Sequence, residues 1–224
     1  MNRRLLIFLK YPAAGTVKTR LAAALGEHAA AALYRLCAEL TLERLRPLLE
    51  EATLYLDPPD ALDRASAWLG PAWMVRPQRG RTLGERLIHA TGEAFAAGAR
   101  RVVVIGTDSP WLRPAQIDAA FGALDEAQLV VGPTDDGGYY AIGLSQPAPA
   151  LFEQVAWSSS RVFAQTLERA SALGLCVRVL DRGYDLDYAG DVERFLEEER
   201  RHAPVSQTVH AIAHLLNEAV GSRL

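Results

Sequence analysis

The chain has 224 residues, of which 50% are hydrophobic and 23% are charged, as is usual for a globular protein large enough to bury a sizeable core. The formal net charge of −3 argues against nucleic-acid binding as the main role, because proteins that bind the phosphate backbone usually carry a basic surplus. No apolar run approaches the length of a membrane span and no signal peptide is visible, so we expect a cytoplasmic protein.

The predicted elements alternate between strand and helix along the chain. In order they are a strand at 5–9, a helical region over 17–51 that breaks near Gly26, a strand at 52–56, a helix at 61–69, a strand at 73–75, a helix at 85–97, a strand at 102–105, a helix at 114–124, strands at 129–131 and 139–144, a helix at 160–173, a strand at 176–180, and helices at 189–201 and 206–219. This order predicts an α/β fold whose mixed, mainly parallel sheet is flanked by helices. The short gap between the strands at 129–131 and 139–144 suits an antiparallel pair. No Pro/Ser-rich linker divides the sequence, so we expect one domain over residues 1–224.

The two cysteines, Cys37 and Cys176, each lie in an apolar segment. Their spacing matches neither a metal site nor a disulfide framework. We therefore expect both to be buried thiols in a reducing compartment.

Cations follow the first predicted strand, in the segment "KYPAAGTVKTRL" that contains Lys10, Gly15, Lys18 and Arg20. Ligands of open α/β sheets bind at the carboxyl ends of the strands. Free backbone N–H groups at a helix start, with cations nearby, favour a phosphate there. The alternative is a solvated first helical turn.

Acidic residues follow three other predicted strands, in "GTDSP" (106–110), "GPTDDGGYY" (132–140) and "DRGYDLDYAGD" (181–191). Asp108 could hold a divalent cation bound to phosphates, or it could cap a turn. Asp185 and Asp187 alternate, so in an extended segment they point the same way, whereas Asp191 suits the start of the next helix. Cations for phosphates and carboxylates for a metal are the two halves of a metal–nucleotide site.

Several motifs along residues 5 to 195 resemble, in order, those of a bacterial family of uncharacterised GT-A-fold proteins described as glycosyltransferase-like or nucleotide-diphospho-sugar transferase-like. These motifs are "FLKYPAAGTVKTRL", "QRGRTLGERL", "GTDSP", "GPTDDGGYYAIGL", "WSSSRV" and "DLDYAGDV". A more distant similarity is to 2-phospholactate guanylyltransferase and the molybdenum-cofactor nucleotidyltransferases. The resemblance implies a single GT-A domain that binds a nucleotide or nucleotide-sugar together with a small-molecule acceptor.

The resemblance also implies roles for individual residues. Asp108 and Asp187 would hold Mg²⁺ or Mn²⁺. The remaining residues that it implies are Gly15, Lys18 and Arg20 at the nucleotide phosphates, Gln78 and Gly80 near the base, and Asp136, Gly137 and Gly138 on the acceptor side. The sequence departs from the family pattern at Thr82, where an aspartate is usual, and at Tyr188 and Ala189, where Thr-Pro is usual.

Three functions are compatible with these residues. We favour a metal-dependent glycosyltransferase-like enzyme with a nucleotide-diphospho-sugar donor, in which Lys18, Asp108 and Asp136 would be catalytic and Asp136 would act as base. The alternative is a nucleotidyltransferase that releases pyrophosphate from an NTP, for which the cations of the first loop are well suited. A further alternative is a nucleotide-binding module without catalysis. The sequence carries no feature that indicates an oligomeric state.

Overall fold

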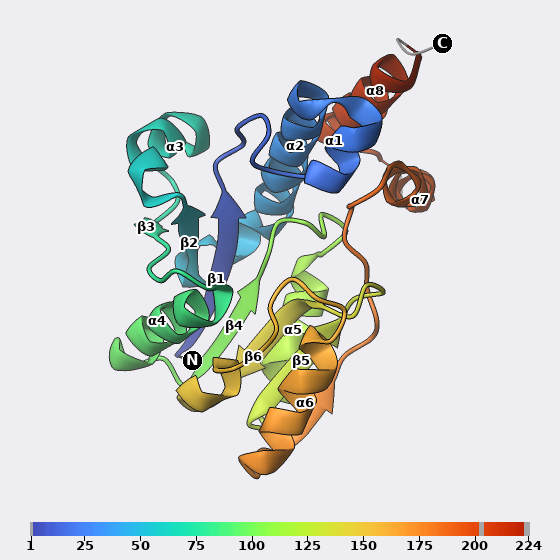
Figure 1. Ribbon diagram of the computed structural model, residues 1–224. Coiled ribbons are helices and arrows are strands. Elements are labelled where there is room, and N and C mark those ends of the chain that lie inside the picture. Colours follow the sequence, from blue (N-terminus) through green and yellow to red (C-terminus); the bar gives the residue numbers. More distant parts are fainter. Residues whose placement is uncertain (1, 202–203, 222–224) are drawn as a thin grey trace. The chain divides into compact units, whose positions relative to one another are not determined.

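The computed structural model describes residues 2–201 and 204–221 (Figure 1). Seven strands form one sheet. They are β1 (Arg3–Lys10), β2 (Ala52–Asp57), β3 (Val75–Pro77), β4 (Arg101–Ile105), β5 (Leu129–Pro133), β6 (Tyr139–Leu144) and β7 (Val177–Val179).

The strands are hydrogen-bonded in the order β3-β2-β1-β4-β6-β5-β7. Only β6 runs antiparallel to its neighbours, pairing with β4 on one side and β5 on the other, whereas β1, β2, β3 and β4 pair in parallel and so do β5 and β7. The predicted mixed, mainly parallel sheet is therefore confirmed, including the antiparallel excursion between β5 and β6.

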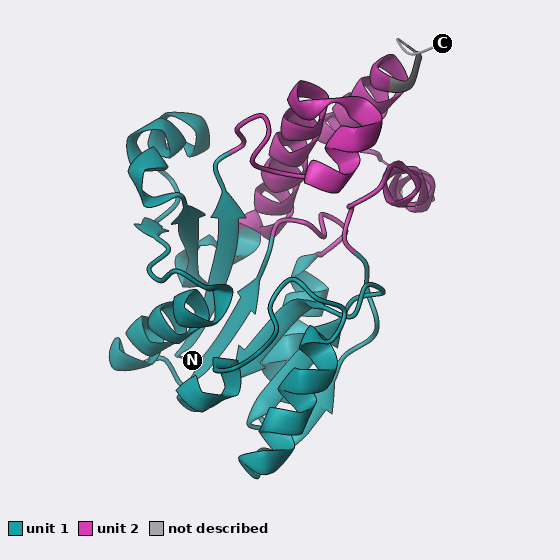
Figure 2. Ribbon diagram, in the orientation of Figure 1, with its two compact units in different colours: residues 1–11, 47–106, 113–184 teal, residues 12–46, 107–112, 185–224 magenta. Residues whose placement is uncertain are grey.

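The chain divides into two compact units, which are coloured separately in Figure 2. Unit 1 contains residues up to 11, 47–106 and 113–184, and unit 2 contains 12–46, 107–112 and the described residues from 185 onward. The α-helices of unit 1 are α3 (Leu62–Leu69), α4 (Leu83–Ala96), α5 (Pro114–Ala123) and α6 (Val162–Ala172), with short 3₁₀ turns at η2 (Pro59–Ala61) and η3 (Pro149–Phe152). The helices of unit 2 are α1 (Thr19–Leu25), α2 (Glu27–Leu45), α7 (Ala189–Arg200) and α8 (Gln207–Gly221), and η1 (Arg46–Glu51) follows α2. A single domain over residues 1–224 stays a prediction.

The core of unit 1 forms around β4, whose sequence "RVVVI" is buried from its second residue onward. When helices cover both faces of a sheet, every side chain of a central strand is buried, so the sequence of that strand is continuously apolar. Val102 and Val104 pack in one cluster with side chains of α4 and α6, while Val103 faces the end of α5 on the opposite side of the sheet. The apolar run thus places β4 at the centre of the unit.

Unit 2 is built from helices that pack on α2, which contacts both α1 and α8. The predicted break at Gly26 is present, because that glycine has a positive φ of 87° and separates α1 from α2. Arg44 near the end of α2 forms an ion pair with Glu199 of α7, and both side chains are almost fully buried. Arg44 also donates to the carbonyl oxygen of Pro110, so α2 holds the segment 107–112 within this unit.

Two sequence predictions need correction. The third strand spans Val75–Pro77 rather than 73–75, because its pairing with β2 begins at Leu54 and Val75, and Met74 is exposed. Cys37 is buried as expected, but Cys176 is exposed. Cys176 directly precedes β7, which is an edge strand with a neighbour on one side only, so the apolar segment around it is less covered than the sequence suggests.

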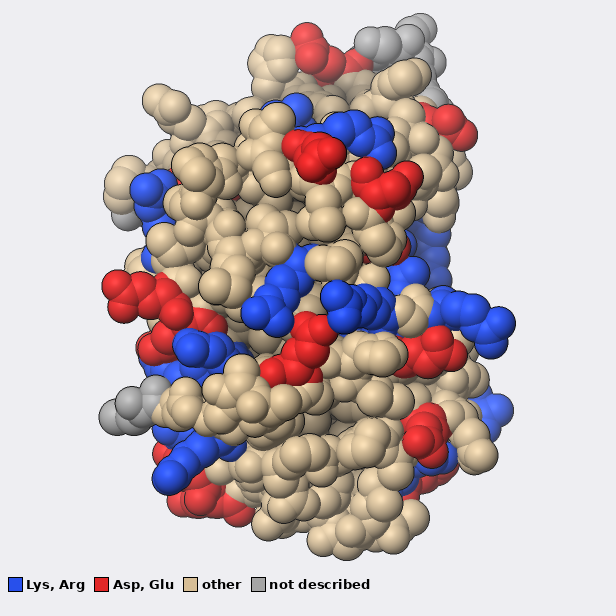
Figure 3. All heavy atoms as spheres, turned by 90° about the vertical axis from the view of Figure 1, so that its left-hand side faces the viewer, with Lys and Arg blue, Asp and Glu red and all other residues tan. Residues whose placement is uncertain are grey.

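Among the described residues no helix is both long and apolar enough to cross a membrane. On the face drawn in Figure 3, Lys and Arg side chains lie beside Asp and Glu side chains, and neither sign covers the face alone.

Candidate functional site

Four residues singled out in the sequence lie together in unit 2. The Nζ atom of Lys18 is 2.5 Å from Oδ1 of Asp108 and 3.2 Å from Oδ1 of Asp187. The Nη1 atom of Arg20 is 2.8 Å from Oδ2 of Asp187. Two cations and two carboxylates from three separate segments thus form one connected cluster, which we call the charge cluster.

Lys18 enters the charge cluster from the N-cap position of α1. Its backbone adopts a left-handed conformation, with φ 49° and ψ 46°, which non-glycine residues rarely adopt. Such strain persists only where the surrounding structure fixes it, and it is frequent at functional sites. The Lys18 side chain is 2% exposed, whereas Arg20 on the first turn of α1 is 50% exposed. The helix start predicted for these two cations therefore holds one of them inside the unit and the other at its surface.

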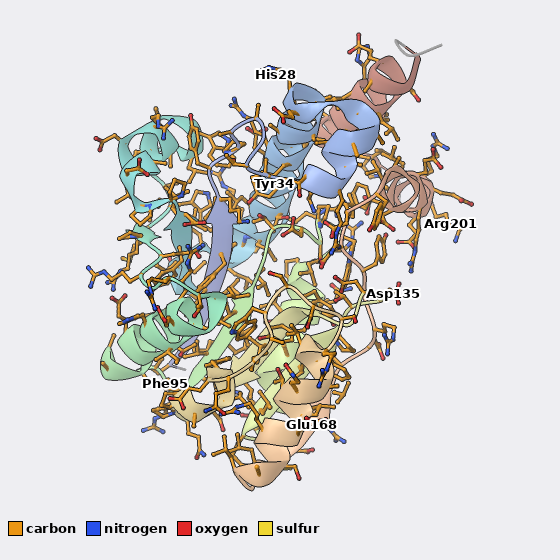
Figure 4. The ribbon with its side chains drawn as sticks, in the orientation of Figure 1. His28, Tyr34, Phe95, Asp135, Glu168 and Arg201 are labelled. Carbon is orange, nitrogen blue, oxygen red and sulfur yellow. The ribbon has the colours of Figure 1, made fainter. Side chains whose placement is uncertain are left out.

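Asp108 is fixed by its backbone and by the residue before it. Its carbonyl oxygen accepts a hydrogen bond from the backbone N–H of Leu186 at 2.9 Å. The hydroxyl groups of Thr107 and Tyr34 are 2.9 Å apart, and Figure 4 shows Tyr34 on α2. The Asp108 side chain remains 48% exposed, so it can reach a ligand while its backbone is held in place.

Asp187 directly precedes Tyr188, which is the N-cap residue of α7. Its backbone N–H and that of Tyr188 both donate to Oδ2 of Asp191, at 3.1 and 2.7 Å. The expectation that Asp191 starts this helix is therefore confirmed, because its carboxylate caps the free N–H groups there. Tyr188 and Ala189, which depart from the family pattern, are compatible with this capped start.

A third carboxylate, Asp185, adjoins the charge cluster. Its Oδ1 accepts a hydrogen bond of 2.6 Å from the hydroxyl of Ser109. Burial, followed by the nearby negative charge of Asp108, raises the pKa of Asp185 to about 7, although Ser109 and Lys18 act in the opposite direction. The sequence signal for this residue is the D-x-D alternation with Asp187, which did not by itself distinguish Asp185 as a site residue.

The raised pKa of Asp185 predicts a pH-dependent stability that Asp185→Asn would remove. An acid whose folded pKa lies above its unfolded pKa contributes stability that is present below pH 4 and is lost as the pH rises through about 7. Because the side chain is partly exposed, we expect Asp185→Asn to gain about 1–3 kcal/mol relative to the parent at pH 8 and much less at pH 5. Urea unfolding in metal-free buffer at both pH values measures this difference, and an equal effect at the two pH values would contradict it.

Two further features of the charge cluster concern Lys18. Burial by itself would lower the pKa of Lys18, but Asp108 and Asp187 outweigh it and raise the pKa, so the ammonium stays protonated. Cys37 is buried within electrostatic range of this ammonium, and burial raises the pKa of its thiol to about 12 despite the opposing effect of Lys18. Cys37 is therefore a neutral thiol, and its position beside the charge cluster had no signal in the sequence.

The donor set of the charge cluster suits a hard divalent cation such as Mg²⁺ or Mn²⁺, which prefers carboxylate oxygens. Asp108 and Asp187 already share one cation, the Lys18 ammonium. Among residues 2–201 and 204–221, no three His, Cys, Asp or Glu side chains are grouped so that they could hold a metal ion by themselves. A metal here would therefore need oxygens of a bound phosphate and of water to complete its coordination.

Gly15 belongs to the same loop of unit 2 and has a positive φ of 77°, which favours glycine. A Cβ atom at this position would lie 3.3 Å from a carboxylate oxygen of Glu27. The structure thus places an acidic side chain, rather than a cation, beside Gly15.

The residues expected near the base, Gln78 and Gly80, lie in unit 1. The Gln78 side chain is buried, and its amide donates to the carbonyl oxygens of Tyr55 at 2.9 Å and Leu9 at 3.3 Å. Its Oε1 accepts from Arg86 at 3.3 Å. A contact between Gln78 and a base stays a prediction, and it would require this amide to give up a backbone partner.

Gly80 and Thr82 have local structural roles at the start of α4. Gly80 has φ 128°, and a Cβ there would lie 2.6 Å from the Cβ of Glu85. The hydroxyl of Thr82 caps the helix by accepting from the backbone N–H of Glu85 at 3.2 Å. Threonine in place of the family's aspartate therefore keeps an N-cap oxygen and loses a charge.

The residues expected on the acceptor side form a tight turn of unit 1 between β5 and β6. Oδ1 of Asp136 accepts from the Thr134 hydroxyl at 2.6 Å and from the Gly138 N–H at 3.0 Å. Gly137 has φ 87°, and an added Cβ would lie 2.1 Å from the carbonyl oxygen of Ser160. Both the acid and the two glycines are thus used by the turn itself, and an acceptor role for them stays a prediction.

Several known proteins similar to this chain are named or described as transferases. Over 193 residues, which are 85% of this chain and 89% of the relative, it is 31% identical to phosphoenolpyruvate guanylyltransferase of Sphaerobacter thermophilus. A crystal structure from Desulfovibrio desulfuricans G20, provisionally described as a nucleotide-diphospho-sugar transferase, superposes with a TM-score of 0.89 and 32% identity over 99% of this chain and 97% of that one. CMP:2-keto-3-deoxy-manno-octonic acid synthetase in complex with CTP shares the fold, with a TM-score of 0.54 and 12% identity over 90% of this chain and 99% of that one.

These similarities confirm the expected nucleotide-diphospho-sugar transferase fold and the expectation of a transferase. They also confirm the distant similarity to guanylyltransferases that the motifs indicated. The model of one bacterial family matches residues 41–159, which is more than half of the sequence. The chain therefore belongs to the family described as uncharacterized protein conserved in bacteria, DUF2064.

Proposed function

We propose that the protein is a metal-dependent nucleotidyltransferase that acts on an NTP and releases pyrophosphate. The observation that carries this proposal is the charge cluster, in which Lys18 and Arg20 meet the carboxylates of Asp108 and Asp187 within unit 2. The relative from Sphaerobacter thermophilus, which is named a guanylyltransferase, supports GTP as the first donor to test.

In the proposed reaction, an oxygen of the acceptor forms a bond to the α-phosphorus of the NTP. The bond from that phosphorus to the bridging oxygen breaks, and pyrophosphate leaves with the electron pair. Lys18 and Arg20 would bind the phosphates and stabilise the negative charge that develops on the leaving group. A divalent cation at Asp108 and Asp187 would neutralise phosphate charge and orient the phosphate chain.

The acceptor that best suits this chemistry is a small molecule with a phosphate group. A phosphate oxygen is already ionised near neutral pH and needs no base to attack. Phosphoenolpyruvate, which the relative's name gives as its acceptor, is a molecule of this kind. Sugar transfer to a hydroxyl with inversion would need a base, and Oδ1 of the candidate base Asp136 accepts two hydrogen bonds within its own turn.

Transfer of a sugar from a nucleotide-diphospho-sugar is the second candidate. It is supported by the 32% identity over nearly the whole chain to the structure from Desulfovibrio desulfuricans G20. The two reactions differ in their product, because nucleotidyl transfer releases pyrophosphate and sugar transfer releases a nucleoside diphosphate.

The test of the proposal is a product assay with Mg²⁺ or Mn²⁺. The protein is incubated with each NTP and phosphoenolpyruvate, and with nucleotide-sugars and a panel of acceptors. We expect pyrophosphate from GTP that depends on acceptor and on metal. Nucleoside diphosphate from a nucleotide-sugar, without pyrophosphate from any NTP, would overturn the proposal in favour of sugar transfer. Nucleotide binding without either product would favour a module without catalysis.

Arg20→Gln tests the phosphate-binding role of the exposed cation in the charge cluster. Each charge-assisted hydrogen bond to a phosphate contributes about 1.5–3 kcal/mol, so we expect the Kd for GTP to rise at least about tenfold. Isothermal titration with the metal–GTP complex measures this change. Arg35→Gln is the matched control, because Arg35 is a similarly exposed arginine of unit 2 that pairs with Glu39. If both variants bind GTP like the parent, Arg20 has no role in binding phosphate.

A further inference from the structure

The charge cluster is electrically balanced before any ligand binds. Lys18 and Arg20 carry two positive charges, and Asp108 and Asp187 carry two negative charges. The buried member of the cluster is Lys18, whose side chain is 2% exposed, whereas the two carboxylates are 48% and 30% exposed. The carboxylates can therefore be reached from solvent while the ammonium that neutralises them is enclosed.

A metal ion that joins Asp108 to Asp187 would compete with Lys18 for the same oxygens. The Nζ atom contacts Oδ1 of both carboxylates, at 2.5 and 3.2 Å. A magnesium ion must come within about 2.1 Å of each ligand oxygen, which brings it close to the ammonium. Two cations at such a separation repel each other strongly in a partly buried site, unless an anion comes between them or the ammonium moves.

The anion that removes this conflict is the phosphate chain of the nucleotide. The Lys18 stem has four carbons, so the ammonium can turn from a carboxylate to a nearby phosphate while the backbone at the start of α1 stays in place. A phosphate would then pair with Lys18, and the metal would pair with the carboxylates and the phosphate together. Metal alone supplies no new partner for the displaced ammonium.

We propose that Lys18 is a resident counter-ion that keeps the carboxylates of Asp108 and Asp187 from binding a metal ion until a nucleotide arrives. The metal then binds with the nucleotide as a complex rather than before it. Lys18 would thus set the order of binding at the site, in addition to its proposed contact with the phosphates. This inference rests on the proposed metal–nucleotide function and adds the regulation of that site.

The test measures Mn²⁺ binding in the absence of nucleotide, using the EPR signal of the free ion. We expect weak binding to the parent and binding at least about tenfold tighter to Lys18→Met, in which the ammonium is replaced by an apolar side chain of similar length. Lys18→Met/Asp108→Asn should lose the gain, which would locate the ion at the carboxylates. Arg35→Gln, which removes a positive charge elsewhere in unit 2, should bind Mn²⁺ like the parent.

A second measurement uses the parent protein and does not depend on the folding of a variant. A GTP analogue with a methylene group between the α- and β-phosphorus should increase the affinity of the parent for Mn²⁺ by about tenfold or more, and that increase should be smaller in Lys18→Met. Equal Mn²⁺ affinity of the parent and a folded Lys18→Met would overturn the inference, as would an affinity of the parent that the analogue leaves unchanged.

The outcomes separate this inference from the proposed function. If pyrophosphate is released from an NTP but Lys18→Met binds Mn²⁺ no more tightly than the parent, the inference fails and the function stands. If Lys18→Met gains Mn²⁺ affinity through Asp108 but the parent releases no pyrophosphate, the function fails and the role of Lys18 as counter-ion stands.

Discussion

Under the proposed function, Asp108→Asn should lower the rate of pyrophosphate release by about 10²–10³-fold, because it removes the carboxylate that would hold a metal ion at the reacting phosphates. Without a metal, an ionised carboxylate and a nucleotide phosphate repel each other, and an ion between them turns this repulsion into a bridge. The amide of asparagine is a neutral and much weaker ligand of similar size. The enhancement of nucleotide binding by Mn²⁺ should be lost together with the rate.

The fold should tolerate this change. The contact that positions residue 108 is made by its backbone, which accepts from Leu186, and Lys18 keeps Asp187 as a partner. Asp118→Asn is the matched control, because Asp118 is a carboxylate of similar exposure that pairs with Arg3 in unit 1. Pyrophosphate release and metal-dependent GTP binding should be measured for both variants. If Asp108→Asn keeps the metal enhancement of the parent, Asp108 only fixes local structure and the site has been placed wrongly.

The sheet could be predicted from the sequence because its central strands are strongly apolar. The sequences of β4 and β6 are runs of apolar residues bounded by polar turns. The observed bounds of these two strands differ from the predicted ones by at most one residue. The edge strands were harder to predict. β3 has three residues and β7 is mostly exposed, so their extent is decided by the register with β2 and β5 rather than by an apolar pattern of their own.

The charge cluster was predictable for a different reason. Asp108 and Asp187 were each expected at the carboxyl end of a strand, and the structure brings both to one ammonium. The sequence could not indicate that this ammonium is enclosed, because the burial of Lys18 depends on how the helices of unit 2 pack. For the same reason it could not show that the amide of Gln78 is used by backbone carbonyl groups, since those groups come from β1 and β2.

The largest effect on stability is expected for Glu199→Ala, which should destabilise the protein by about 3–5 kcal/mol. Glu199 and Arg44 form an ion pair whose side chains are 7% and 9% exposed. Removing the glutamate leaves the charge of the guanidinium in a buried place, and the energy needed to desolvate it is no longer offset by this carboxylate. Urea unfolding measures the loss. Arg44 also lies over the ring of Phe195 and donates a hydrogen bond to the carbonyl oxygen of Pro110. A displaced Arg44 should therefore also destabilise the segment 107–112.

Two comparisons isolate burial as the cause of this effect. Glu197→Ala removes an exposed partner of Arg201 from the same helix, where both side chains are more than two-thirds exposed, and it should change the stability by less than about 0.5 kcal/mol. Arg44→Met/Glu199→Leu replaces the whole buried pair with apolar side chains of similar volume, and its stability should return to within about 1 kcal/mol of the parent. The double variant would still lack the Arg44 contact to Pro110, so its pyrophosphate release should remain lower than that of the parent. Equal losses in Glu199→Ala and Glu197→Ala would mean that the buried pair contributes no more than a surface pair.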